Sequence, residues 1–201
     1  MLQLTIELDL TIKTSSIIII VYNRIVMLKL FKILVPVLLV ASCGMKPSID
    51  DDKLSDRKFS LEEFFDGETT AYGQFQDILG NVSRRFTVDI TGSWDGSNLR
   101  LIEDFVYEDG SEEQRIWNLV KTSDNEWIGS ADGVIGKAEG ITSGDMFYWA
   151  YTIDLPTPDG KTRVSFKDYM WMLSETRVLN KAYMSKWGIP LGEVTIMFER
   201  N

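Results

Sequence analysis

Hydrophobic and polar residues alternate with a period of two along most of the chain after residue 68. Successive side chains of a β-strand point to opposite faces, so this alternation is typical of half-buried strands. It predicts ten strands, at residues 69–78, 83–94, 99–107, 113–121, 126–132, 136–142, 146–155, 162–173, 177–187 and 193–200. Short turns that contain Gly, Asn or Asp separate them, and we expect neighbouring strands to pair as antiparallel hairpins.

One short helix is predicted before the first strand, in FSLEEFFDG at residues 59–67. Ser60 is a typical N-cap, Glu63 follows three residues later as in a capping box, and Gly67 is typical of a helix end.

A meander of about ten strands leaves two unpaired edges, and closure of the sheet into a barrel removes both. The pattern therefore predicts an all-β fold, an antiparallel up-and-down meander closed into a barrel of about eight to ten strands. The segment GSADGVIGKAEG at residues 129–140 is rich in Gly and Ala. Such small residues let a sheet bend sharply or let neighbouring groups approach the backbone.

Several strands carry bulky apolar side chains on both faces, so the alternation alone does not say which face lines the barrel. Two interpretations stay open: a solidly packed core, and a lumen that holds an apolar molecule. The polar members of the predicted lumen could form a structural clamp or grip the head group of a ligand. The residues predicted to line the lumen are Asp104, Arg115, Trp149, Tyr151, Met170, Trp171, Met172 and Met184.

An apolar run, ILVPVLLVAS at residues 33–42, follows the basic residues Lys29 and Lys32 and precedes the single cysteine, Cys43. This is the layout of a secretion signal, and the run is too short to span a bilayer. We expect residues 1–42 to be an N-terminal extension and signal peptide, with Met27 as the true start. Residues 43–58 are then a flexible tether and residues 59–201 the barrel domain.

The absent and rare residue types exclude several kinds of site. The sequence has no histidine, so histidine-based catalytic triads and metal sites are excluded. A single cysteine excludes an intramolecular disulfide. Residues 43–201 carry a net charge of -11, which repels nucleic acid. We expect no metal and no cofactor.

Two resemblances extend this interpretation. Val40-Ala41-Ser42-Cys43 resembles the bacterial lipobox, which implies acylation of Cys43 and cleavage before it. With Gly44 next, the resemblance implies an anchor in the outer membrane. The segments LIEDFVYEDG, QRIWNLVK and WIGSADGVIGKAEG resemble the bacterial lipoproteins known as domain of unknown function 3833. That family is similar to lipocalin-like barrels, so the resemblance implies a lipocalin-like barrel but no activity.

Three hypotheses for the function follow. The first is a non-catalytic, lipid-anchored protein that binds or carries an apolar, lipid-like ligand. The second is an envelope interaction protein that docks a periplasmic or membrane partner. The third is an enzyme that uses carboxylates as acid and base, with Glu103, Asp104 and Asp132 as candidates. Glu103 and Asp104 are adjacent and point to opposite faces, so they cannot serve one site, and we expect no enzyme.

Overall fold

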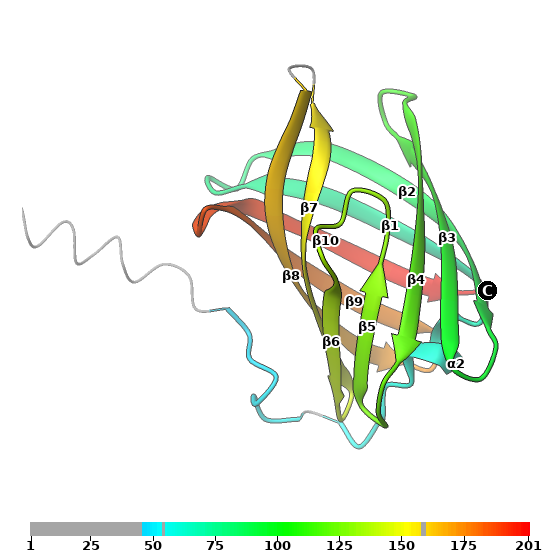
Figure 1. Cartoon of the computed structure of the whole chain (residues 1–201). Helices are drawn as coiled ribbons and strands as arrows, with labels where there is room; N and C mark the ends of the chain where they lie inside the picture. The colour runs from blue at the N-terminus through cyan, green and yellow to red at the C-terminus, as the bar shows by residue number, and fades with distance from the viewer. Residues whose placement is uncertain (1–45, 54, 158–159) are drawn as a thin grey trace, which may run out of the picture. The chain divides into compact units, whose positions relative to one another are not determined.

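The computed structural model describes residues 46–53, 55–157 and 160–201. The predicted signal peptide and Cys43 lie outside these residues. Within the barrel domain, ten antiparallel strands follow one another in sequence order around a closed barrel (Figure 1). β1 pairs with β10, from Thr69 opposite Arg200 to Asp77 opposite Gly192, and this ladder closes the sheet. The predicted closed all-β meander is confirmed.

All ten predicted strands are present, and their bounds differ from the prediction by a few residues. The largest difference is in β10, which begins at Ile189 because the β9–β10 turn is only two residues long. The strands are β1 (Gly67–Asp77), β2 (Val82–Trp94), β3 (Asn98–Tyr107), β4 (Glu112–Lys121), β5 (Glu126–Ser130), β6 (Ala138–Ser143), β7 (Met146–Thr157), β8 (Gly160–Ser174), β9 (Arg177–Lys186) and β10 (Ile189–Arg200).

The predicted helix is α2 (Leu61–Phe65), a single turn and a quarter. Ser60 is its N-cap, because the Ser60 hydroxyl accepts a hydrogen bond from the Glu63 amide at 3.3 Å. Leu61, Phe64 and Phe65 are all buried. So short a helix has little stability of its own, and these three apolar side chains hold it in place.

α2 closes one end of the barrel (Figure 1). The Phe65 ring packs edge-on against Phe198 of β10, with 5.4 Å between ring centroids. On the other side of the helix, Lys121 of β4 pairs with Glu62. The backbone of Gly92 in β2 contacts the helix directly, since a Cβ atom there would overlap the Phe65 carbonyl oxygen.

The opposite ends of these strands present apolar side chains to solvent. The β1–β2 turn exposes Ile78 and Leu79, and the β9–β10 turn exposes Trp187 and Ile189. The two turns lie side by side in Figure 1, as the β1–β10 pairing requires. Trp187 is 88% exposed and has a positive φ of 53°, a backbone conformation that a bulky residue rarely adopts.

Residues 48–53 and 55–58 precede the barrel, and several of them lie near the β6–β7 turn. The Ser55 hydroxyl donates to the Asp145 carboxylate at 2.6 Å, and the Phe59 amide donates to the Gly144 carbonyl at 2.8 Å. These bonds fix the end of the segment that leads into the barrel. Within the described residues, no helix is both long and apolar enough to cross a membrane.

Candidate functional site

A cavity of about 580 Å³ runs through the barrel. Leu61 and Phe65 of α2 form its closed end. At the other end the lining includes Ser83, Arg84 and Pro156, which are exposed, so the cavity reaches the surface there. The volume lies within the range of roughly 300–1,000 Å³ that is typical of small-molecule pockets.

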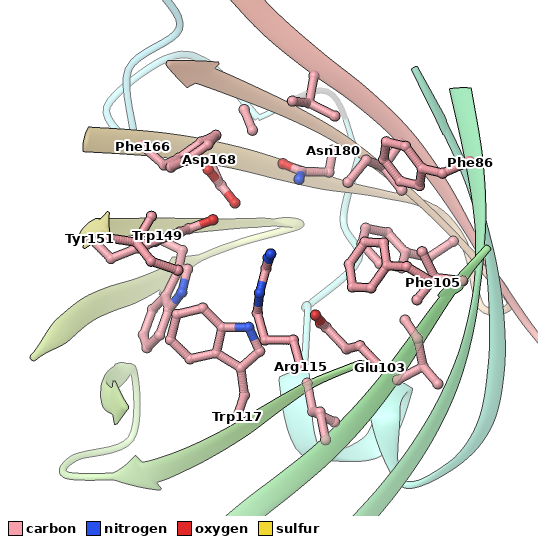
Figure 2. A pocket seen from close by; sticks show the side chains of 18 of the residues that line it. Phe86, Glu103, Phe105, Arg115, Trp117, Trp149, Tyr151, Phe166, Asp168 and Asn180 are labelled. Carbon is pink, nitrogen blue, oxygen red and sulfur yellow. The ribbon is translucent and has the colours of Figure 1, made fainter. Parts of the chain in front are cut away.

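Aromatic side chains from three strands form one wall of the cavity (Figure 2). Trp117 of β4 packs edge-on against Trp149 and Tyr151 of β7, at centroid distances of 5.7 Å and 5.2 Å. Tyr151 stacks on Phe166 of β8 at 5.1 Å. This continuous wall offers flat apolar surface to an apolar molecule.

Glycines give this wall its shape. A Cβ atom on Gly140 of β6 would overlap the Trp149 indole, and one on Gly129 of β5 would stand 2.7 Å from the same ring. Trp149 therefore lies flat over the backbone of two neighbouring strands. Gly129 and Gly140 allow the close approach that the sequence predicts for the 129–140 segment.

A group of polar side chains crosses the middle of the cavity. Arg115 of β4 points into the lumen between Glu103 of β3 and Asp168 of β8, and Asn180 of β9 lies beside them (Figure 2). Glu113, two residues before Arg115, faces the same lumen. We call these residues the lumen cluster: Glu103, Glu113, Arg115, Asp168 and Asn180.

Within the lumen cluster, Arg115 is already paired. Its guanidinium donates to the Glu113 carboxylate at 2.7 Å, and Glu103 lies directly opposite Arg115 in the β3–β4 register. The Tyr107 hydroxyl donates to the other Glu113 oxygen at 2.9 Å. Burial would lower the pKa of Arg115, but Tyr151, Glu103 and Glu113 outweigh it and raise that pKa, so Arg115 stays charged.

Asp168 and Asn180 are buried with unpaired atoms. Asp168 is 6% exposed and Asn180 is 1% exposed. One carboxylate oxygen of Asp168, Oδ1, and the amide oxygen of Asn180 have no hydrogen-bond partner. Both atoms are acceptors of residues that line the cavity, and such atoms are costly to leave unpaired.

The two deep carboxyl groups titrate near neutral pH. Burial raises the pKa of Asp168 to about 7, which the Asn180 side chain partly offsets by hydrogen bonding. Burial also raises the pKa of Glu103 to about 7, against the opposing charge of Arg115. Perturbed pKa values cluster at functional sites, so these two carboxyl groups are candidates for a functional role.

The sequence matches the model of one protein family, described as a protein of unknown function (DUF3833), over residues 37–200. The chain belongs to the DUF3833 family. A comparison with curated proteins finds no match.

Solved structures show a related fold for this DUF3833 protein. The S-type phycobiliprotein lyase CPES from Guillardia theta has a TM-score of 0.54 at 13% identity, over 71% of this chain and 93% of the lyase. The structure of EF1p2_mFAP2b bound to DFHBI has a TM-score of 0.38 at 9% identity, over 69% of this chain and 95% of that chain. The lyase establishes a lipocalin-like barrel and nothing about activity.

Five of the eight residues predicted to line the DUF3833 lumen do so: Arg115, Trp149, Tyr151, Met170 and Met184. Three predicted positions are wrong. Asp104 is exposed on the outer face, where it accepts a hydrogen bond from Gln114 at 2.8 Å. Trp171 does not line the cavity and stacks on Tyr169 at 6.3 Å, and Met172 packs against the core beyond the cavity.

Strand geometry explains the corrections at Asp104 and Trp171. Glu103 faces the lumen, so its neighbour Asp104 must point outward. Trp171 lies between Met170 and Met172 and points away from both for the same reason. On the outer face of the barrel, Tyr169 contacts Trp171, Tyr148 and Tyr183. This outer aromatic group accounts for the bulky residues on the second face of β8.

Four residues of the lumen cluster are absent from the predicted set: Glu103, Glu113, Asp168 and Asn180. A signal for Asp168 exists in the sequence. Asp168 lies on the same strand face as the apolar residues Val164, Phe166 and Met170. If that face points inward, the Asp168 carboxylate must point inward too. Among the described residues, no group of three or more Cys, Asp or Glu side chains is arranged to hold a metal ion.

Proposed function

We propose that this DUF3833 protein is a non-catalytic, lipid-anchored protein of the outer membrane whose barrel binds or carries an apolar, lipid-like ligand. The observation that carries the proposal is the cavity of about 580 Å³, which α2 closes at one end and which reaches the surface at the other. A barrel of this size that served only as a scaffold has no need of an unfilled lumen.

The exposed apolar turns support a function beside lipid. Ile78, Leu79, Trp187 and Ile189 lie at the same end of β1, β2, β9 and β10 as Ser83 and Arg84, where the cavity opens. A tip that combines an exposed indole with aliphatic side chains suits contact with the interface of a membrane. A ligand that leaves the lumen would pass over an apolar rim.

The anchor rests on the sequence alone. The lipobox-like Val40-Ala41-Ser42-Cys43 places a thiol where acylation requires one. Two or three acyl chains hold a protein on a membrane far more firmly than one, since each buried methylene adds about 0.8 kcal/mol. An anchored barrel would keep its ligand close to the bilayer.

The three residues named from sequence as acid–base candidates do not share one site. Asp104 is on the outer face, and Asp132 lies in the connection between β5 and β6. Only Glu103 of the three faces the lumen.

The ligand proposal is tested by native mass spectrometry of the protein purified from its membrane in mild detergent. We expect an apolar adduct on the barrel in addition to the covalent acyl groups, and quenching of tryptophan fluorescence by added apolar ligands. A Leu101→Trp variant fills the lumen and should lose both signals, whereas Val106→Trp, on the outer face, should keep them. An adduct that persists in Leu101→Trp would contradict the proposal.

The anchor is tested by intact mass and membrane fractionation. Protein from its native host should begin at an acylated Cys43 and sediment with outer membranes. Cys43→Ser should remain unacylated and leave that fraction. A free Cys43 thiol in a chain that retains its leader would refute the anchor without touching the ligand proposal.

A second candidate, an envelope interaction protein, is favoured by a depression on the outer face. It has a volume of about 620 Å³ and is lined by Tyr72, Val106, Leu179 and Met197 among others. Tyr72 and Val106 are about half exposed. Crosslinking in cells from a photoreactive residue at position 72 would recover a constant partner on this hypothesis, and no partner on the first.

A further inference from the structure

The lumen cluster presents more hydrogen-bond acceptors than donors. Asp168 Oδ1 and the Asn180 amide oxygen are buried and lack partners, and both residues line the cavity. They come from neighbouring strands, since Met170, two residues after Asp168, lies opposite Asn180 in the β8–β9 register. An unpaired buried acceptor destabilises the protein, and a ligand that donates hydrogen bonds to it would remove this cost.

Charge favours the same kind of ligand. The charged side chains that line the cavity are three carboxylates, Glu103, Glu113 and Asp168, and two guanidinium groups, Arg84 and Arg115. Arg115 donates to Glu113, and Arg84 lies at the exposed end with its guanidinium carbon 3.4 Å from the Tyr107 ring centroid. When all five of these described side chains are ionised, their net charge is -1. A bound monovalent cation would neutralise this charge, and a bound monovalent anion would double it.

We propose that the ligand is a cationic amphiphile, with a primary-amine head group against Asp168 and Asn180 and an apolar body along Trp117, Trp149 and Phe166. This inference rests on the proposed ligand-binding function and gives that ligand a chemical class. An ammonium group has three donors and no acceptor, which matches a site made of unpaired acceptors. The aromatic wall adds attraction for a cation near its faces.

A carboxylate ligand fits the same cavity less well. Among the described residues that line the cavity, Arg115 is the one cation at depth, and its contact with Glu113 at 2.7 Å would have to break or be shared. The ligand carboxylate would also face Glu103 and Asp168. Those two groups would have to stay protonated, at a cost that increases with pH.

The affinity for an amine should increase with pH. The groups that face Asp168 are Glu103 of β3, Arg115 of β4, Tyr151 of β7 and Asn180 of β9. Among these, Glu103 and Asp168 lose protons near pH 7. Because an ammonium group stabilises the ionised carboxylates, binding below pH 7 releases protons and is weaker than binding at pH 8.

The test compares octylamine, octanol and octanoate as probes of equal chain length, with the lipidated protein in detergent at pH 8 and tryptophan quenching as the signal. We expect octylamine to bind at least about 10-fold more tightly than octanoate, because hydrogen bonds to charged groups are worth about 1.5–3 kcal/mol. Asp168→Asn should weaken octylamine at least about 10-fold and leave octanol within about threefold. Asn180→Ala should weaken octylamine by a smaller factor.

Asp154→Asn is the matched control. Asp154 lies on the outer face of β7, where it pairs with Arg163 at 2.7 Å, and its loss should change no affinity. A given probe partitions into the detergent to the same extent for every variant. The ratio of its affinities for two variants is therefore independent of this partition. Near-UV circular dichroism establishes whether each variant is folded. If Asp168→Asn does not fold, Asn180→Ala provides the test.

The alternative outcomes separate this inference from the proposed function. If octanoate binds most tightly and Arg115→Met removes that preference, the ligand is an anion and the inference is overturned. If the three probes bind equally and Asp168→Asn changes none, the lumen cluster holds water only. If no probe quenches the tryptophans, the ligand-binding function itself fails, and the inference with it.

Discussion

Gly92 of β2 lies in contact with the Phe65 carbonyl group at the end of α2, and a side chain at position 92 would occupy the same space as that oxygen. The end of α2 therefore packs directly against the β2 backbone at Gly92. Since Leu61 and Phe65 also line the cavity, the contact between Gly92 and Phe65 decides how the closed end of the lumen is sealed.

Gly92→Ala should displace α2 and lower the free energy of unfolding by at least about 2 kcal/mol, because a methyl group cannot fit beside a backbone carbonyl without moving it. Urea denaturation measures this loss. Ser93→Ala, at the next and exposed position, should change the free energy by less than about 0.5 kcal/mol. Equal stability of the two variants would show that α2 does not depend on Gly92.

Gly140→Ala should move the Trp149 indole away from β6. We expect a loss of about 1–3 kcal/mol in unfolding free energy and a change in tryptophan emission, since overpacking forces the ring off its present position. Ser130→Ala, an exposed position at the end of β5, is the control. Unchanged emission and stability in Gly140→Ala would contradict the packing of Trp149 over the glycine backbone.

The ion pair between Arg115 and Glu113 should be worth more than the exposed pair between Arg163 and Asp154. Both have a shortest N–O distance of 2.7 Å, but the Arg115 side chain is 18% exposed and the Arg163 side chain 58%. Double-mutant cycles with Arg115→Met and Glu113→Gln should give a coupling energy of about 1.5–3 kcal/mol.

The cycle for the outer pair, with Arg163→Met and Asp154→Asn, should give less than about 1 kcal/mol. Because Tyr107 also donates to Glu113, the Tyr107→Phe background should reduce the inner coupling. Equal coupling energies for the two pairs would show that burial does not strengthen the contact.

The stability of the ligand-free protein should fall as pH rises from about 4 to about 8. The pKa of Asp168 rises from 3.8 to about 7 on folding, so in this window the folded state holds a proton that the unfolded state has lost. The contribution of Asp168 is therefore present below pH 4 and lost as pH passes 7. Asp168→Asn should flatten the profile by on the order of 4 kcal/mol.

Urea denaturation at several pH values measures both profiles, and the difference between them isolates Asp168 from the other carboxyl groups. Asp154→Asn, whose pKa is lowered by its bond with Arg163, should keep the steep profile between pH 5 and 8. Parallel profiles for the wild type and Asp168→Asn would mean that Asp168 is ionised when the protein folds at neutral pH.

The sequence predicts the strands well and the lumen only in part, for a physical reason. Alternation and turn residues are local, and they define strands such as β4 and β7 within two residues. Which face turns inward depends on the closure of the whole sheet. β8 has bulky side chains on both faces, so the sequence pattern assigns Trp171 to the lumen as well as its neighbour Met170. Only Met170 lines the cavity.

Buried charge is the feature that sequence predicts least. Glu103 and Asp104 are chemically alike, and only the register with β4 decides that Glu103 faces Arg115 inside the barrel. The pairing of Arg115 with Glu113, two residues earlier on one strand, is readable from the period of two. The unpaired acceptor atoms of Asp168 and Asn180 can be identified only from the three-dimensional structure.

The central claim, that the lumen binds an apolar ligand, is tested most directly by a crystal structure with ω-bromododecanol. We predict anomalous bromine density inside the barrel, along the wall formed by Trp117, Trp149 and Phe166. Bromine density on the outer face beside Tyr72 and Met197, with an empty lumen, would contradict it.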